Sequence, residues 1–202
     1  MMLTRGNKKL GRCIAIFSLP AGNGQFGTCK RKCPGCYALK IERLRPVVLT
    51  NRIRNLAISE NPRFELCISR ELHRLKNEKE PIKYVRVHEG GDFYNQEYVE
   101  KWWGIAMTHP DLTFYCYTKA TDQVDFSGIK MQKNFIVFDS LKPLKRKPNF
   151  LPKREFEKIA NTPSHPLWIQ ACRYDNTGEC GVNCIYCMKK ENEENCPIFL
   201  KH

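Results

Sequence analysis

The chain has 202 residues, of which 42% are hydrophobic and 11% aromatic, and this predicts one folded domain and excludes both intrinsic disorder and two large domains. No apolar run approaches the ~20 residues that a membrane-spanning helix needs, so we expect no membrane partner. The 34 lysines and arginines outnumber the 21 acidic residues, and the net charge of +13 favours an anionic partner such as nucleic acid, a nucleotide or a phosphorylated substrate.

The first predicted element is a buried strand over residues 13–19, "CIAIFSL". Four basic residues precede it, as they would precede the apolar segment of a secretory signal peptide. The apolar run is short, however, and a cysteine-dense loop follows it, so we expect the first strand of a cytoplasmic protein. A glycine-rich segment, "PAGNGQFG", leads from this strand to the cysteines.

Three helices are predicted next. Residues 37–45 have a helical pattern that ends before a proline, and the apolar positions of residues 49–57 mark a second helix. An Asn-Pro pair opens a third, which extends over about residues 61–76. Cys67 is expected to be a small buried hydrophobe, because it shares one face of this helix with four apolar residues. These are Phe64, Ile68, Leu72 and Leu75.

Strands and a long helix follow. Residues 82–93 are predicted to form a strand and its exit loop. Asn95 can cap the next helix, whose apolar stripe of Val99, Trp102, Trp103, Ala106 and Met107 places both tryptophans in the core. Three more strands are predicted at residues 112–118, 134–138 and 167–171.

This alternation predicts an α/β fold, with a mainly parallel sheet of about five to six strands and helices, open or curved into a partial (β/α) barrel. We expect an α/β core over residues 1–171 and a cysteine-rich, metal-binding extension over residues 172–202. Ligands of such sheets bind at the carboxyl ends of the strands. The cysteines after the first strand, the "HEGGD" that follows the next one and Cys172 after the last should therefore meet at one edge.

The eleven cysteines are clustered, and clustering in a chain of this length favours metal binding in a reducing compartment over a disulfide scaffold. Three cysteines stand outside both clusters, namely Cys13, Cys67 and Cys116. The others are Cys29, Cys33 and Cys36 near the start of the chain, and Cys172, Cys180, Cys184, Cys187 and Cys196 near its end.

The first cluster, "CKRKCPGC", has the spacing C-x3-C-x2-C. Three thiolates can hold a [4Fe–4S] cluster and leave one iron open for chemistry. The basic residues at positions 30–32 would favour the thiolate forms and offset the cluster's negative charge. Two alternatives remain open, a zinc site closed by a distant fourth cysteine and a loop without metal. Cys29, Cys33 and Cys36 are called the triplet below.

The triplet resembles the cysteine loop of the radical S-adenosylmethionine superfamily, which also follows the first strand of an α/β domain. The resemblance implies an open-iron [4Fe–4S] cluster that binds S-adenosylmethionine, an external electron donor, and reductive cleavage of the bound cofactor. That superfamily has a glycine-rich motif after the second strand that contacts the cofactor. "HEGGD" is similar to it and implies contacts from Glu89, Gly90, Gly91 and Asp92.

The second cluster repeats the C-x3-C-x2-C spacing at Cys180, Cys184 and Cys187. Too few residues follow it to build a sheet, so we expect a closed site of four thiolates that contributes to folding. Cys172 is the expected fourth ligand, with Cys196 as the alternative. The bound group is expected to be a second [4Fe–4S] cluster or a zinc ion.

Most of the chain also resembles a small family of phage-encoded proteins of unassigned function, typified by a mycobacteriophage gene-eighty-eight protein. The segments "FSLPAG", "CPGCYA" and "VRVHEGGDFYNQEYVEKW" carry this likeness. It implies a phage source, and hence the cytoplasm of a host cell, and brings no established reaction. The principal functional hypothesis is a short radical S-adenosylmethionine enzyme, and the alternative is a non-enzymatic, zinc- or iron–sulfur-stapled protein that binds nucleic acid.

Overall fold

The computed structural model describes most of the chain, and three sequence predictions fall outside it. These are the strand at 167–171, the ligand Cys172 and its alternative Cys196, and with them the predicted boundary between the core of residues 1–171 and its extension. The described residues are 1–7, 9–22, 24–31, 33–141, 150–164, 180–182, 184–190 and 199–200.

The centre of the described fold is an open five-stranded sheet in the order β1-β2-β3-β4-β5. The strands from β2 to β5 are parallel, and β1 pairs antiparallel with β2 at the edge. This confirms an α/β fold with a mainly parallel sheet. The sequence pattern missed β1, because two residues are too few to show alternation. The strands are β1 (Thr4–Arg5), β2 (Ile14–Phe17), β3 (Tyr84–Val87), β4 (Thr113–Thr118) and β5 (Phe135–Asp139), with a separate pair of β6 (Phe150–Leu151) and β7 (Phe199–Leu200).

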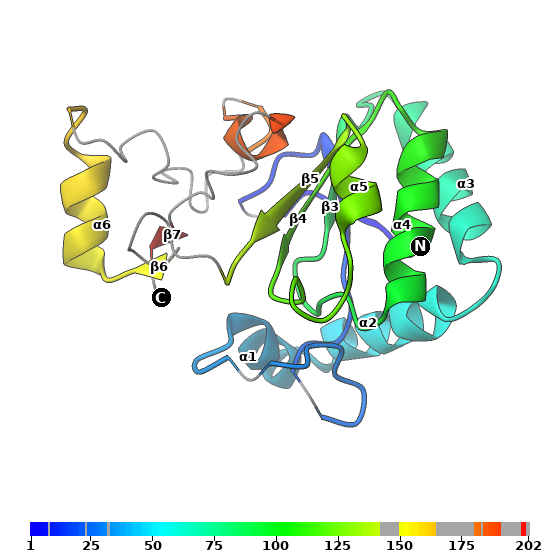
Figure 1. Ribbon diagram of the computed structural model, residues 1–202, viewed down its shortest axis with the longest axis horizontal. Coiled ribbons are helices and arrows are strands. Elements are labelled where there is room, and N and C mark those ends of the chain that lie inside the picture. The colour runs from blue at the N-terminus through cyan, green and yellow to red at the C-terminus, as the bar shows by residue number, and fades with distance from the viewer. Residues whose placement is uncertain are drawn as a thin grey trace.

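Helices α1 to α4 lie close to their predicted positions, whereas α5, α6 and η2 were not predicted. Asn95 caps α4 as expected, because its Oδ1 accepts a hydrogen bond from the backbone nitrogen of Tyr98 at 2.9 Å. Figure 1 shows α3, α4 and α5 side by side on one face of the sheet, with α1 and α2 at one end of it. The helices are α1 (Tyr37–Leu44), α2 (Pro46–Ser59), α3 (Phe64–Lys76), α4 (Gln96–Thr108), α5 (Ser127–Met131), α6 (Lys153–Ala160) and the short 3-10 helix η2 (Tyr186–Met188).

The predicted apolar stripe of α4 is wrong at two positions. Trp102 is fully buried, but Trp103 is 38% exposed and Met107 is 56% exposed. The buried face of the helix includes Ile105 instead. The ring of Trp103 lies beside Gly128 of α5 at the edge of the core. The two adjacent tryptophans therefore divide between the core and its rim, as a helix of 3.6 residues per turn requires.

Both faces of the sheet are covered, because the side chains of each strand alternate between two apolar clusters. One face packs against α3, α4 and α5, and this cluster includes Phe17, Val85 and Cys116, the last of which is buried as predicted. Cys67 is only half-buried on α3. The other face packs against α6 and η2, through Tyr115, Phe156, Met188 and their neighbours.

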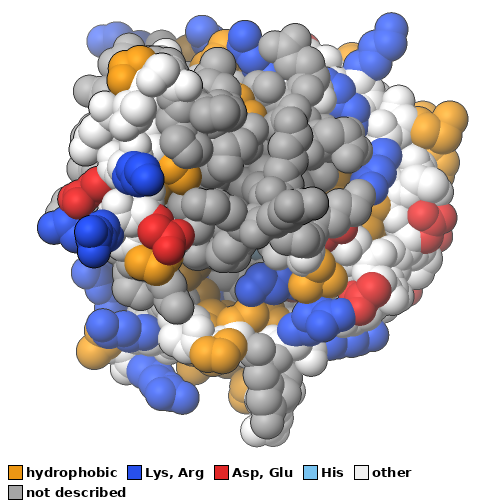
Figure 2. All heavy atoms as spheres, turned by 60° about the vertical axis from the view of Figure 1, so that its left-hand side comes forward, with side chains coloured by type: hydrophobic (Ala, Val, Ile, Leu, Met, Phe, Trp, Pro, Cys, Tyr) orange, Lys and Arg blue, Asp and Glu red, His pale blue; other side chains and the backbone are white. Residues whose placement is uncertain are grey.

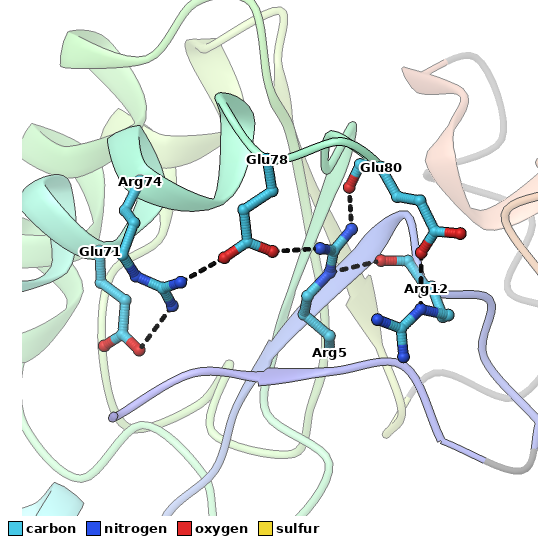
Figure 3. Close-up of polar contacts among 6 residues, drawn as sticks. All are labelled: Arg5, Arg12, Glu71, Arg74, Glu78 and Glu80. Atoms are coloured by element: carbon cyan, nitrogen blue, oxygen red, sulfur yellow. Dashed lines mark hydrogen bonds and ion pairs between the residues drawn. The ribbon is translucent and has the colours of Figure 1, made fainter.

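A network of ion pairs between charged side chains connects β1 to the end of α3 (Figure 3). Arg5 is its centre and is only 11% exposed. The outer pairs are exposed and contribute little to stability. The largely enclosed Arg5 thus holds the short edge strand in place. The residues of this network are Arg5, Arg12, Glu71, Arg74, Glu78 and Glu80.

Two features bear on the expected partners. None of the helices in the described ranges is long and apolar enough to cross a membrane. Figure 2, viewed toward the side that carries α6, shows the described lysines and arginines around the margin of this face and not in one patch. The densest basic stretch of the sequence, residues 142–154, lies largely outside the described residues.

Candidate functional site

The triplet lies on the loop that leaves the carboxyl end of β2. This loop folds back toward the strand, because Thr28 donates to the Pro20 carbonyl through both its backbone nitrogen and its hydroxyl, at 3.0 and 2.9 Å. The backbone nitrogen of Cys29 donates to the Gly22 carbonyl at 2.9 Å. Helix α1 begins directly after Cys36. The loop thus brings the three cysteines to the strand end, as the sequence predicted.

The three thiols of the triplet are half-buried, and none of the cysteines in the described part of the chain forms a disulfide. Burial, together with the charges of Asp92, Cys36 and Cys33, raises the pKa of Cys29 to about 11. The three thiols are therefore close enough to affect one another electrostatically. As they stand, no three His, Cys, Asp or Glu side chains of the described residues are grouped to hold a metal ion.

Lys119 is the functional residue that the sequence reasoning missed. It follows β4, and its Nζ lies 3.2 Å from the Sγ of Cys33. A cation at this distance would offset negative charge on a group bound there. The carboxyl-end rule could have found it, because Lys119 directly follows a parallel strand just as the triplet and "HEGGD" do.

Asp92 ties together the loops that follow three neighbouring strands. Its Oδ1 accepts from the Thr118 hydroxyl at 2.6 Å, and its Oδ2 accepts from the backbone nitrogen of Lys119 at 2.9 Å. Its own backbone nitrogen donates to the Thr28 hydroxyl at 3.0 Å. Burial raises the pKa of Asp92, against these hydrogen bonds, which lower it. The carboxylate predicted to contact a cofactor is thus occupied by protein donors and positions Lys119.

The two glycines of "EGGD" are needed by the protein itself. A Cβ at Gly90 would overlap the Arg52 guanidinium, and one at Gly91 would lie 2.6 Å from the Cβ of Leu19. Gly91 also has a φ of 81°, in the left-handed region that favours glycine. The space beside both residues is filled by neighbouring side chains and not open for a ligand.

Glu89 is the member of this loop whose carboxylate remains near the surface. It is half-buried, and its Oε1 accepts a hydrogen bond from the Asn7 side chain at 2.9 Å. The hydroxyl of Tyr37, the residue after the triplet, donates to the Glu89 carbonyl. This contact connects the start of α1 to the loop after β3, so the triplet and Glu89 lie at one edge of the sheet.

A buried ion pair joins the segments around the site. The Arg52 guanidinium lies 2.7 Å from Oε1 of Glu42, and the two side chains are only 6% and 5% exposed. The same carboxylate oxygen accepts from the backbone nitrogen of Ala21 at 2.9 Å. Since Glu42 lies on α1, Arg52 on α2 and Ala21 on the loop before the triplet, this pair joins three segments around the cysteines.

A surface hollow of about 500 Å³ opens beside the triplet. Its wall combines two thiols with apolar and basic side chains, so it can accept a group that is partly apolar and partly anionic. A Cβ built on Gly35 would meet no atom within 4 Å, which leaves space between the cysteines at this point. The lining residues are Cys33, Gly35, Cys36, Leu39, Lys40, Arg43 and Leu44.

His88 ends the strand beside this site but is a core residue. Its Nε2 lies 2.8 Å from the Tyr98 hydroxyl, its ring packs edge-on against Phe93, and its Nδ1 has no hydrogen-bond partner. Burial, with a smaller contribution from the Arg86 cation, lowers the pKa of His88 to about 3. The imidazole is therefore neutral at physiological pH.

This predicts a specific acid sensitivity. The unfolded chain takes up a proton on this imidazole below about pH 6.5, whereas the folded protein does so only near pH 3. The free energy of unfolding should therefore fall as the pH falls through this window. Urea unfolding at pH 7 and pH 5 measures the drop, which should be smaller in His88→Gln. An unchanged drop in the variant would contradict the assignment.

The C-terminal cysteines lie elsewhere in the fold. Figure 1 shows η2, which contains Cys187, at the opposite end of the sheet from α1. Cys180 and Cys187 pack against the cluster on the second face of the sheet, and Cys184 is half-buried. The structure thus separates these three cysteines from the triplet, whereas the sequence placed their expected partner Cys172 at the same edge as the triplet. Cys172 lies outside the described residues, and its predicted role as fourth ligand stays a prediction.

An open α/β sheet with a cysteine loop at its carboxyl edge defines the class of the protein, and comparison with known proteins gives its family. The model of the family described as Gene product 88 matches residues 1–163, and the chain belongs to this family. The matched region contains the triplet and "HEGGD" but not the C-terminal cysteines.

One relative is the Gene 88 protein of Mycobacterium phage L5, which is 24% identical over 152 residues. The alignment covers 68% of this chain and 61% of the relative, so the chain spans less than two thirds of that protein's length. No solved structure matches the chain. These matches confirm the predicted likeness to the phage family.

Proposed function

We propose that this protein is a small iron–sulfur enzyme that binds S-adenosylmethionine and cleaves it reductively, with an electron from a separate donor. The observation that carries the proposal is the meeting, at one carboxyl edge, of a C-x3-C-x2-C loop, the loop of residues 89–92 and the Lys119 cation 3.2 Å from Cys33. The net charge of +13 favours an anionic substrate, with nucleic acid among the candidates.

The residues at this edge fit a [4Fe–4S] cluster in their chemistry. Cys29, Cys33 and Cys36 supply three soft ligands, and the hollow beside them has space next to Gly35. Binding would draw the three thiols together and release their protons, including the proton that burial keeps on Cys29. When bound, such a cluster would supply an electron to the sulfonium of S-adenosylmethionine. The iron that no cysteine of the protein binds would be the one open to the cofactor.

The neighbouring residues have distinct roles in this proposal. Lys119 offsets negative charge next to Cys33, and Lys40 and Arg43 are the cations that line the hollow. Glu89 offers a carboxylate to the amino group of the cofactor. Asp92 is a positioning residue, because its carboxylate is occupied by donors from β4 and its exit loop. Gly90 and Gly91 shape the loop and leave no space of their own for a ligand.

The test is anaerobic reconstitution with iron and sulfide, followed by reduction with dithionite in the presence of S-adenosylmethionine. We expect the wild type to bind iron, absorb near 400 nm and release 5′-deoxyadenosine and methionine. Cys33→Ala should lose both the triplet-bound iron and product release. Cys67→Ala, at a half-buried cysteine of α3, is the matched control and should retain them.

Two results would overturn the proposal. One is the absence of iron from the triplet after reconstitution, and the other is a complete cluster whose electron paramagnetic resonance signal ignores added S-adenosylmethionine. A colourless protein that holds zinc and binds nucleic acid would support the alternative of a metal-stapled, non-enzymatic binding protein.

A further inference from the structure

Cys13, which stands alone in the sequence, lies against the loop of the C-terminal cysteines. Its thiol donates to the Gly181 carbonyl, with Sγ 3.3 Å from the oxygen. A Cβ built on Gly181 would lie 3.1 Å from the same sulfur, so the contact is close. Two residues before Cys13, the backbone nitrogen of Gly11 donates to the Cys180 carbonyl at 2.8 Å. The start of β2 is thus joined to a segment about 170 residues later in the chain.

The segment from Cys180 to Cys187 is itself tightly folded. The backbone nitrogen of Gly181 donates to the Cys184 carbonyl at 2.8 Å, and an isolated β-bridge pairs Cys180 with Cys184. Gly181 has a φ of 87°, which allows the reversal between these two cysteines. The short helix η2 then carries Cys187. Three cysteines are therefore held on one compact loop.

Three of these cysteines pack against one apolar cluster, and the backbone of the fourth is paired with one of them. Cys13, Cys180 and Cys187 all pack against the cluster on the second face of the sheet, beside Tyr115. Cys184 is bridged to Cys180. The set contains no competing carboxylate ligand, and four thiolates are the donor set of a closed, tetrahedral structural site. The close packing of Cys13 on Gly181 favours a single ion over a bulkier cluster.

We propose that Cys13, Cys180, Cys184 and Cys187 bind one thiophilic metal ion, with zinc as the expected ion. The site joins the start of β2 to residues 180–187 and closes the second face of the sheet. Cys13 takes the position that the sequence assigned to Cys172. As the thiols stand they are not grouped at ligand distances, so binding draws them together and releases their protons. The proposal does not rest on the chemistry at the triplet.

The experiment isolates this site by changing Cys29, Cys33 and Cys36 to serine. This chain should bind one zinc per molecule, measured by elemental analysis after removal of loosely bound metal. Adding Cys13→Ser should abolish the bound zinc and lower the melting temperature. Adding Cys67→Ser, the matched control on α3, should change neither. Because the triplet is absent, the result is independent of whether S-adenosylmethionine is cleaved.

A second variant keeps the proposal testable if Cys13→Ser does not fold. Cys13→His retains a metal ligand, so a chain loaded with Co²⁺ should fold and lose part of its sulfur-to-cobalt charge-transfer absorption. Three results would overturn the proposal. They are zinc that survives Cys13→Ser, a triplet-free chain without bound metal, and bound iron accompanied by acid-labile sulfide, which indicates a cluster.

Discussion

Alanine at position 91 is expected to destabilise the protein by about 2–5 kcal/mol, whereas alanine at position 35 should cost only about 1–2 kcal/mol. The two glycines form a matched pair, because both have positive φ angles, 81° at Gly91 and 68° at Gly35. Each substitution therefore imposes the same kind of backbone strain. They differ in what surrounds the added methyl group.

At Gly91 the added Cβ would lie 2.6 Å from the Cβ of Leu19, 2.7 Å from the Thr28 hydroxyl and 2.8 Å from the Leu19 carbonyl. Two of these contacts involve atoms that cannot rotate away, so the loop after β3 must shift. At Gly35 no atom lies within 4 Å. The difference of about 1–3 kcal/mol is the overpacking contribution alone.

Urea unfolding of both variants, without added metal or cofactor, measures the difference. Equal midpoints for the two variants would mean that the space beside Gly91 is open, as a cofactor contact at this glycine would require. A larger loss at Gly91 supports the packing role that its neighbours indicate.

Loss of the Glu42 carboxylate is the second large expected effect. Glu42→Ala leaves the Arg52 guanidinium buried without its partner, and removing one member of a buried pair costs about 3–5 kcal/mol. It also leaves the backbone nitrogen of Ala21 without its acceptor. We expect a large loss of stability and, since Ala21 precedes the triplet, weaker metal binding by the triplet.

An exposed ion pair supplies the control. Lys76 lies 2.8 Å from Asp111, whose side chain is 58% exposed, so Asp111→Ala should cost at most about 1 kcal/mol. Thermal melts compare the two variants, and iron binding after reconstitution reports on the triplet. A loss at Glu42 no greater than that at Asp111 would show that the buried pair is not needed. The double variant Glu42→Leu, Arg52→Met should recover stability, because no unpaired charge remains buried.

The sequence predicted the sheet and the position of the triplet because both depend on local patterns. Strands β2 to β5 are apolar runs, and parallel strands necessarily bring the loops that follow them to one edge. The triplet and residues 89–92 therefore came together as expected. The two-residue strand β1 carries no periodicity and was missed.

What could not be predicted depends on packing between distant segments. The position of Lys119 after a strand indicates the edge where it lies but not that its amine reaches Cys33, 86 positions earlier, and nothing local to Cys13 indicates that residue 181 returns to it. The hydrogen bonds from Asp92 to β4 and its exit loop could not be predicted either, because a carboxylate in a glycine-rich loop has the same sequence pattern whether it faces a ligand or a neighbouring strand. Burial and hydrogen-bond partners separate these cases, and only a structure gives them.

The hydrogen bonds of Asp92 have a consequence for how the family can change. They join the exits of β2, β3 and β4 through backbone and hydroxyl groups of the protein alone. The conformational entropy of ordering these exits is therefore lost during folding and not when a ligand arrives. The exposed part of the triplet loop, around Pro34 and Gly35, is outside this network. Side chains there can change among relatives while the strand exits keep their geometry, so variation in residue type, and not in the spacing of the cysteines, should concentrate at these positions.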